Sequence, residues 1–307
     1  MKISLVTPAG PGLRNGNRHT ALRWAAFLRA AGHRVAVSTK DLDSDADLLL
    51  ALHARRSHES IVDFWRRHPA RPIVVALTGT DIYRDIHVSE EAQESLERAD
   101  RLIVLQPRAA EELAPRLRDK VSVVVQSSST TLRHRPVKDK FRLCVIGHLR
   151  EEKDPLRALA ALRFLSNPSL EIFQIGALLD PRLKPQTKDK RYKWLGGVAH
   201  ARALKVLASS SAMVISSRME GGANVVCEAI RIGVPVLASR VSGNAGLLGD
   251  DYAGYFDTGD EASLAALIMK VQDKGALYRT LKRQMAKLRP MVAPKAEARA
   301  LLAAIRA

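Results

Sequence analysis

The chain has 307 residues, enough for one large or two medium-sized domains. Hydrophobic residues make up 46% and charged residues 26% of it, a composition that excludes collagen-like, disulfide-scaffold and disordered proteins. The 49 Lys and Arg residues exceed the 32 Asp and Glu residues, so the formal net charge is +17 and an anionic ligand or partner is expected.

The cysteines and the N-terminus give expectations about the cellular environment. Cys144 and Cys227 lie in apolar segments and are too few for a disulfide framework or a cysteine metal cluster. The apolar run after Lys2 ends at Pro8, and no stretch approaches the roughly 18 apolar residues of a membrane span. We therefore expect a soluble, cytoplasmic protein without a signal peptide or stable membrane insertion.

Short aliphatic runs alternate with segments of helical periodicity along the first half of the chain. This alternation predicts βα units that build a parallel sheet buried on both faces. A helix that Gly32 ends is expected between the first two strands. The predicted strands cover residues 3–7, 35–38, 48–52, 73–77, 102–105 and 121–125.

The pattern pauses at the polar segment RPVKDK near residue 136 and then repeats. We predict an α/β fold of two Rossmann-like domains, residues 1–136 and 137–290, with a ligand cleft between them and a C-terminal helix, 291–307, that packs back on the first domain. In the second domain the predicted strands cover 141–146, 170–175, 212–215 and 234–238, and the helices 155–165, 201–209, 224–232 and 262–271.

Two segments imitate well-known motifs. GPGLRNG, residues 10–16, follows a strand as a dinucleotide fingerprint does, but its glycine spacing is wrong and Pro11 interrupts it. DLDSDAD, residues 41–47, resembles a calcium loop but has Ala46 where that loop needs glycine. We therefore favour neither a nicotinamide oxidoreductase nor a bound metal, and we predict no cofactor.

The loop after the strand at 141–146 carries two cations three residues apart, Arg150 and Lys153. Arginine can grip phosphate oxygens with a planar fork and lysine acts as a point charge, so the pair suits a diphosphate. A solvated charged turn is the alternative interpretation.

Two glutamates, Glu220 and Glu228, enclose a segment that begins Gly-Gly-Ala-Asn. Small residues at the start of a helix leave backbone N–H groups accessible to phosphate or sugar oxygens. A carboxylate two turns into that helix can accept hydrogen bonds from two ribose hydroxyls, and Glu220 can accept from sugar hydroxyls. An ordinary, partly buried helix acid remains the alternative for Glu228.

These segments together resemble the GT-B glycosyltransferases, in the bacterial group related to sucrose-phosphate and lipopolysaccharide transferases. The resemblance rests on GHLREEK at 147–153, the pair Glu220 and Glu228, SGNAGLL at 242–248, the glycine-rich N-terminal loop, and LTGTDIY at 77–83. It covers nearly the whole chain and implies a UDP-sugar donor and no catalytic metal.

Residue roles follow from this resemblance. Arg150 and Lys153 would hold the donor diphosphate, and Glu220 would hold the donor sugar, which makes these three the predicted catalytic residues. The resemblance further implies donor binding by Gly16, Gly196, Val198, Gly221, Gly222, Ala223, Asn224 and Glu228.

The chain departs from the family at Thr78, where the family usually has a histidine beside the reacting sugar. A sugar hydroxyl benefits from such a base, whereas an acceptor that is ionised at pH 7 needs none. We expect such an anionic acceptor to be bound by Asn15, Asn17, Arg18, His53, Thr80 and Asp81, with Arg14 nearby; solvated loop residues and a structural histidine are the alternatives.

The compact length, RNGNRHT at 14–20, LTGTDIY and EGGANVVCEA resemble the selenosugar synthases of selenoneine biosynthesis. This resemblance implies transfer from a UDP-sugar, typically UDP-N-acetylglucosamine, to selenophosphate, with a 1-seleno sugar as the product. The small-molecule partners would be these two substrates.

Two other functions remain open at this point. One is a conventional glycosyltransferase with a hydroxyl or lipid-linked acceptor, because residues 270–307 are strongly basic. The other is nucleic-acid binding, which we do not favour because aromatic residues make up only 5% of the chain. The sequence does not indicate an oligomeric state.

Overall fold

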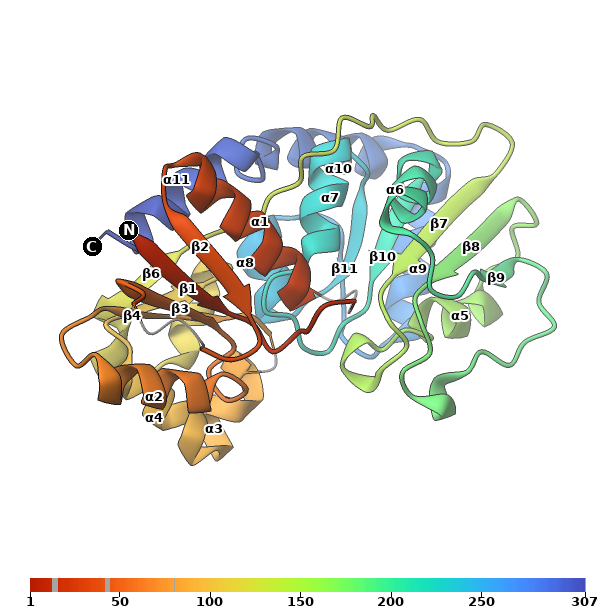
Figure 1. The fold of residues 1–307 in the computed structure, drawn as a ribbon. Helices are drawn as coiled ribbons and strands as arrows, with labels where there is room; N and C mark the ends of the chain where they lie inside the picture. The colour runs from red at the N-terminus through yellow and green to blue at the C-terminus, as the bar shows by residue number, and fades with distance from the viewer. Residues whose placement is uncertain (13–15, 42–44, 80, 307) are drawn as a thin grey trace. The chain divides into compact units, whose positions relative to one another are not determined.

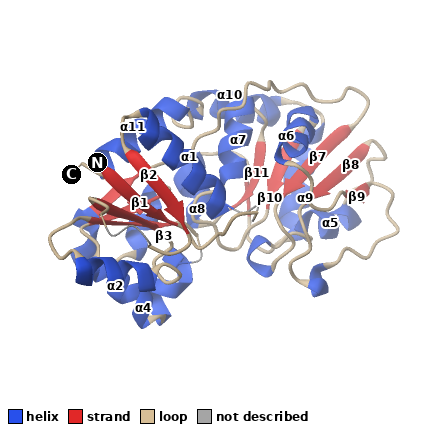
Figure 2. Cartoon of the chain, viewed as in Figure 1, coloured by secondary structure: helices blue, strands red, loops and turns tan. Residues whose placement is uncertain are grey.

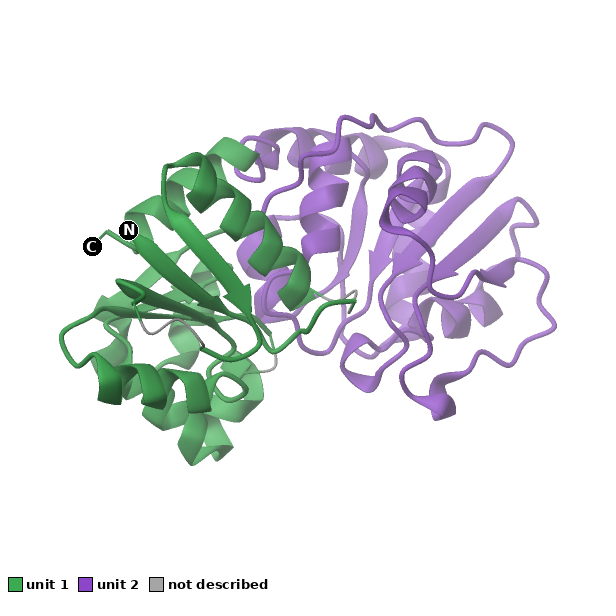
Figure 3. Ribbon diagram, in the orientation of Figure 1, with its two compact units in different colours: residues 1–126, 294–307 green, residues 127–293 purple. Residues whose placement is uncertain are grey.

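The computed structural model describes residues 1–12, 16–41, 45–79 and 81–306 (Figure 1). The chain forms two compact units, Met1–Gln126 together with Pro294–Ala307, and Ser127–Ala293 (Figure 3). Among the described residues, each unit is built on a six-stranded parallel sheet flanked by helices (Figure 2).

The first unit has the strand order β2-β1-β3-β4-β5-β6. Its strands are β1 (Lys2–Val6), β2 (Arg34–Ser38), β3 (Leu48–Leu52), β4 (Ile73–Leu77), β5 (Arg101–Val104) and β6 (Val121–Val123). Its helices are α1 (Gly16–Ala30), α2 (His58–Arg67), α3 (Ile86–Val88), α4 (Glu90–Arg98) and α11 (Pro294–Ala304).

Both faces of this sheet are covered. Leu49 and Ala51 of β3 pack with side chains of α2 and α4, whereas Leu48 and Leu50 pack with side chains of α1 and α11. A strand with apolar side chains on both faces is stable only inside a covered sheet, which explains the continuous apolar run of β3.

Helix α11 belongs to the first unit although it ends the chain. Trp24 of α1 donates through Nε1 to Oε1 of Glu297 at 2.7 Å, and Arg23 donates through Nε to Oε2 at 2.8 Å. The Glu297 side chain is fully buried, and Leu301 joins the core beneath it. The buried carboxylate therefore joins the last helix to the first.

The second unit has the strand order β12-β11-β10-β7-β8-β9. Its strands are β7 (Phe141–Ile146), β8 (Leu170–Ile175), β9 (Tyr192–Trp194), β10 (Ala212–Ile215), β11 (Val236–Ser239) and β12 (Tyr255–Phe256). Its helices are α5 (Arg157–Ala161), α6 (His200–Ser209), α7 (Asn224–Ile232), α8 (Ser242–Leu248), α9 (Glu261–Gln272) and α10 (Ala276–Leu288).

The first unit ends before residue 136, where the sequence pattern pauses. Residues 127–140 have little regular structure, but their backbone is hydrogen-bonded to the second unit. The N–H groups of His134 and Arg135 donate to the carbonyls of Ile232 and Ala208, at 3.2 and 2.8 Å. The polar, proline-bearing segment is thus bonded to the C-terminal ends of α6 and α7 and is not a free linker.

Some predicted elements differ in extent. The strand predicted at 234–238 begins at Val236, because the N–H of Val234 donates to the carbonyl of Ala229 and so closes α7. The helix predicted at 155–165 is limited to α5, followed by a 3-10 turn at Leu162–Phe164. Among the described residues, no helix is both long and apolar enough to cross a membrane.

Candidate active site

The loop after β7 carries Arg150 and Lys153, and this cationic loop contacts the loop after β10. Lys153 ends a short 3-10 turn, Glu151–Lys153, and its Nζ donates to Oε2 of Glu220. The hydroxyl of Ser217 donates to the same oxygen at 3.0 Å. The structure therefore brings together two of the three predicted catalytic residues as an ion pair, with the Glu220 side chain 8% exposed and that of Lys153 22% exposed.

Backbone hydrogen bonds fix these two loops against each other. The carbonyl of Glu152 accepts from the N–H groups of Arg218 and Met219, at 2.9 and 3.4 Å, and the hydroxyl of Ser216 donates to the carbonyl of Asp154 at 2.7 Å. The backbone positions of Lys153 and Glu220 are thus fixed by the loops that follow strands β7 and β10.

Arg150, the third predicted catalytic residue, is more exposed. Its side chain is 43% exposed, and its Nε lies 3.9 Å from Oε2 of Glu152, too far for a hydrogen bond. A guanidinium held so loosely remains available to an anionic ligand.

Helix α7 begins directly after the glycine-rich segment. Gly221 and Ala223 are buried, whereas Gly222 and Asn224 are partly exposed at the helix start. The positive end of the helix dipole therefore lies a few residues from Glu220 along the chain.

Glu228 lies inside α7 and pairs with a residue that the sequence analysis missed. Its Oε1 lies 2.7 Å from Nε2 of His200, the first residue of α6. The Glu228 side chain is 15% exposed and that of His200 is 55% exposed, so a ligand can reach the histidine. No sequence spacing links residues 28 positions apart in this way; only the packing of α6 on α7 does.

Helix α8 lies unusually close to Glu220. A Cβ atom at Gly243 would lie 1.6 Å from the carbonyl oxygen of Glu220, a distance that no side chain can occupy. Behind this contact, the buried Asn244 donates to the carbonyl of Ser239 at 2.9 Å. The segment SGNAGLL therefore supports the backbone that carries Glu220.

The ends of β7, β8 and β9 also lie side by side. The N–H of Gly176 donates to the carbonyl of Gly196 at 2.9 Å, and a Cβ at Gly176 would lie 1.9 Å from the carbonyl oxygen of Gly147. Gly196 has a φ of 67°, a conformation that favours glycine, and Val198 is partly exposed two residues later. Gly196 and Val198 are two of the residues predicted to bind the donor.

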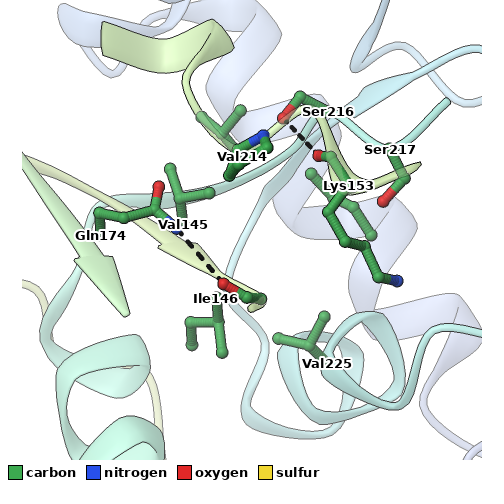
Figure 4. Close-up of a pocket in the computed structure, with 11 residues that line it drawn as sticks. Val145, Ile146, Lys153, Gln174, Val214, Ser216, Ser217 and Val225 are labelled. Atoms are coloured by element: carbon green, nitrogen blue, oxygen red, sulfur yellow. Dashed lines mark hydrogen bonds between the residues drawn. The ribbon is translucent and has the colours of Figure 1, made fainter. Parts of the chain in front are cut away.

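A small cavity of about 20 Å³ lies beneath the cationic loop, and Lys153, Gln174 and Ser216 are among its lining residues (Figure 4). Gln174 is fully buried and its Nε2 lies 3.5 Å from the carbonyl of Gly147, while its Oε1 has no hydrogen-bond partner among the described residues. The cavity is large enough for about one water molecule and too small for a sugar.

In the first unit, Asp81 serves the backbone. It is fully buried, and its carboxylate accepts from the N–H groups of Ala54, Thr78 and Gly79, at 3.2, 3.0 and 2.7 Å. These bonds hold the loops after β3 and β4 together, so Asp81 fixes the backbone of the region that is predicted to bind the acceptor.

His53 lies at the same edge of the sheet. It is 3% exposed, and its φ of 77° is rare for a residue other than glycine. Burial lowers the pKa of His53 below its ordinary value, and the nearby Asp81 carboxylate offsets part of this effect. The N–H of Arg56 donates to Nδ1 at 3.3 Å, so the neutral ring carries its hydrogen on Nε2.

The remaining predicted ligand-binding residues of this unit lie near the start of α1 or outside the described residues. Gly16 is exposed, and Asn17 and Arg18 are partly buried in the first turn of α1. Asn15 and Thr80 lie outside the described residues, as does Arg14. The roles of all these residues stay predictions.

Asp41 and Asp47 are engaged in pairing within the protein. Asp41 accepts from the hydroxyl of Ser4 at 2.6 Å and pairs with Arg67, and Asp47 accepts from the N–H of Lys2 at 2.7 Å. Asp43 lies outside the described residues.

Comparison with known proteins identifies the family. The family model described as "Glycosyl transferases group 1" matches residues 130–288, just over half of the chain. "Glycosyltransferase 1 domain-containing protein 1" of Xenopus tropicalis is 25% identical over 275 residues, which cover 78% of this chain and 79% of that protein.

Solved structures agree in fold over the whole chain. Sucrose-phosphate synthase from Thermosynechococcus elongatus is similar with a TM-score of 0.78 at 17% identity, covering 99% of this chain and 98% of the other. Anabaena HepE in complex with UDP-glucose is similar with a TM-score of 0.79 at 16% identity, covering 100% and 99%. The two parallel sheets with their flanking helices form the GT-B fold, which confirms the predicted fold class. The chain therefore belongs to the group 1 glycosyltransferases.

Proposed function

We propose that this enzyme transfers a sugar, N-acetylglucosamine, from its UDP-linked donor to selenophosphate and forms a carbon–selenium bond. The observation that carries the donor half is the ion pair of Lys153 and Glu220 beside the start of α7. It gathers a cation, a sugar-binding carboxylate and a helix N-terminus at one edge of the second unit. Anabaena HepE, which shares the fold, was solved with UDP-glucose bound.

Donor binding would change the partners of Lys153. The diphosphate carries more negative charge than a carboxylate. The ammonium of Lys153 would therefore turn from Glu220 towards the diphosphate, and Arg150 would add a bidentate contact. Glu220 would then accept from hydroxyls of the sugar. As the bond from the anomeric carbon to the UDP oxygen breaks, Lys153, Arg150 and the amides of 222–224 would stabilise the charge that develops on UDP.

The acceptor half of the proposal follows from what the first unit offers. Thr78 stands where the family's histidine would assist a hydroxyl, and the Nδ1 lone pair of the buried His53 already accepts from the N–H of Arg56. An anionic selenium nucleophile needs no base. Selenium would bond to the anomeric carbon as UDP leaves, and water would later cleave the selenium–phosphorus bond to release phosphate and the 1-seleno sugar.

Mass spectrometry of the products tests this proposal. The protein is incubated with UDP-N-acetylglucosamine, with and without selenophosphate, and the products are examined for the selenium isotope pattern on a hexosamine. We expect that pattern only when selenophosphate is present. UDP release with another acceptor and no selenium-bearing product would reject the selenophosphate assignment.

One observation favours a second candidate, transfer to a lipid-linked hydroxyl. Helix α10 carries Arg279, Arg283 and Lys287 on its exposed face at four-residue spacing, and such a basic face can contact anionic lipid. Flotation with anionic liposomes distinguishes the two: firm binding favours the lipid-linked acceptor, and a protein that stays with the aqueous fraction favours the small anionic one.

A further inference from the structure

A buried carboxylate in the first unit organises two arginines. Asp85 is 2% exposed and ends the helical turn after the Asp81 loop. Arg84 donates through Nε to Oδ1 of Asp85 at 3.2 Å, and Nε of Arg55 lies 3.2 Å from Oδ2. One carboxylate therefore holds two guanidinium groups, one at each oxygen.

The two arginines use only their inner nitrogen for this contact. Among the described residues, no other hydrogen bond or ion pair joins the side chain of Arg55 or Arg84, and these side chains are 42% and 47% exposed. Each guanidinium has five N–H donors, of which four are on the terminal nitrogens. Those terminal nitrogens remain available for a ligand, and a planar fork of this kind matches the oxygens of a phosphate group.

The charge balance of the cluster leaves room for an anion. The guanidinium groups of Arg55 and Arg84 and the carboxylate of Asp85 carry a net charge of +1. Around the buried His53, the negative charge of Asp81, 4.0 Å from Nδ1, is matched by the positive charge of Arg56. Two like charges held together repel each other, and a bound oxyanion would remove that repulsion.

Buried polar atoms without partners lie beside the arginines. Nε2 of His53 lies 3.8 Å from Oδ2 of Asp85, and neither atom has a hydrogen-bond partner among the described residues; the same holds for the buried hydroxyl of Thr78. His53 also has the rare φ of 77°, and such backbone strain tends to persist at functional sites.

The position of the cluster agrees with a ligand site. His53 follows β3, and Thr78 follows β4, two neighbouring strands of the parallel sheet. Ligands of open parallel sheets bind at the carboxyl ends of the strands.

We propose that Arg55 and Arg84 form a binding site for a small phosphate-type oxyanion, with Asp85 as the residue that positions them. Resting on the proposed function, this site takes the phosphate end of selenophosphate. The acceptor phosphate accepts from the terminal nitrogens of both arginines, and Nε2–H of His53 is the adjacent donor.

Calorimetric titration with inorganic phosphate tests the site directly. Saturating UDP is present throughout, so that phosphate cannot occupy the donor site. Arg55→Gln and Arg84→Gln should each weaken phosphate binding at least about tenfold, because each removes a charged hydrogen-bonding group. Arg66→Gln, which changes an exposed arginine of α2 with no partner among the described residues, is the matched control and should bind as the wild type does. Wild-type affinity in both site variants, or no phosphate binding by the wild type at millimolar concentration, would overturn the site.

Asp85→Asn separates positioning from charge. The substitution removes a negative charge, so a purely electrostatic site would bind phosphate more tightly, whereas a site that depends on Asp85 to hold the arginines binds it more weakly. We expect weaker phosphate binding with unchanged UDP affinity, and an unchanged circular dichroism spectrum and melting temperature show that the first unit of the variant is folded. Tighter binding would contradict the positioning role.

Steady-state kinetics distinguish a failure of the oxyanion site from a failure of the proposed function. If a selenium product forms, Arg55→Gln and Arg84→Gln should raise the KM for selenophosphate and leave the KM for the UDP-sugar unchanged; an unchanged selenophosphate KM would reject the site alone. If phosphate binds as expected but no selenium product forms, the proposed function fails and the oxyanion site stands.

Discussion

At the scale of single residues, the proposed donor site rests on one ion pair. Lys153 and Glu220 are 67 positions apart, and the structure joins them through the ends of two neighbouring strands. The sequence supports each residue separately, through its neighbours and its resemblance to a family. It does not predict that they pair with each other, because that contact depends on the register of β7 against β10.

Replacing Lys153 with alanine should lower kcat/KM for the UDP-sugar by about two to three orders of magnitude, because the developing charge on UDP loses a preorganised cation. Lys184→Ala, which changes an exposed lysine of the same unit, is the control and should keep wild-type turnover. Circular dichroism checks that both variants fold. Near-normal turnover of Lys153→Ala would remove this residue from the catalytic site.

Replacing Gly243 with alanine should impair donor binding through Glu220. The added Cβ would lie 1.6 Å from the carbonyl oxygen of Glu220, so α8 and the Glu220 loop must move apart. We expect a higher KM for the UDP-sugar together with a lower melting temperature. A variant with wild-type KM and melting temperature would show that this contact does not constrain the site.

At the scale of elements, the strands that carry the site were predictable and several contacts between elements were not. Apolar runs marked β3, β4, β7, β8 and β10 with the bounds that the structure has, since a strand buried on both faces needs continuous apolar side chains. Short edge strands such as β9 and β12 carry no such run and were missed.

The contacts between helices depend on tertiary packing. Glu228 and His200 pair where α7 packs on α6, and no local sequence pattern predicts this pair. Likewise, the pairing of Arg55 and Arg84 with Asp85 joins the loop after β3 to the turn after β4. Sequence reasoning identified His53 and Asp81 in this region through their neighbourhood and missed the arginines, which look like ordinary surface charges.

His134 makes the stability of the second unit depend on pH. Burial, together with Lys282, lowers its pKa from 6.5 to about 4, and Nε2 lies 2.8 Å from the carbonyl of Ser210. Between the pKa of His134 in the folded chain and its pKa in the unfolded chain, the unfolded chain binds more protons than the folded one. The free energy of unfolding therefore falls as the pH falls through this range. The wild type should lose about 2 kcal/mol more than His134→Gln between pH 7 and pH 5. Urea unfolding of both proteins at the two pH values measures this; parallel losses would contradict it.

At the scale of the whole molecule, the last helix completes the first unit. Glu297 joins α11 to Arg23 and Trp24 of α1 from a fully buried position. Glu297→Ala leaves the indole N–H without its acceptor and should lower the free energy of unfolding by about 1–3 kcal/mol. Lys295→Ala, an exposed change in the same helix, should have little effect in the same urea titration. Equal midpoints for the two variants would show that this link is not needed.

The net charge of +17 also has a partial explanation at this scale. Arg150 and Lys153 serve the proposed donor diphosphate, and Arg55 and Arg84 the proposed acceptor phosphate. In these two proposals each substrate has its own pair of cations on its own unit, which suits a reaction between two anionic small molecules.

The most direct test of that reaction is the carbon–selenium bond itself. UDP-N-acetylglucosamine labelled with carbon-13 at the anomeric position is incubated with the enzyme and selenophosphate labelled with selenium-77, and the product is observed by NMR. We expect an anomeric carbon signal split by one-bond coupling to selenium. An anomeric carbon in the product without that coupling, alongside released UDP, would contradict it.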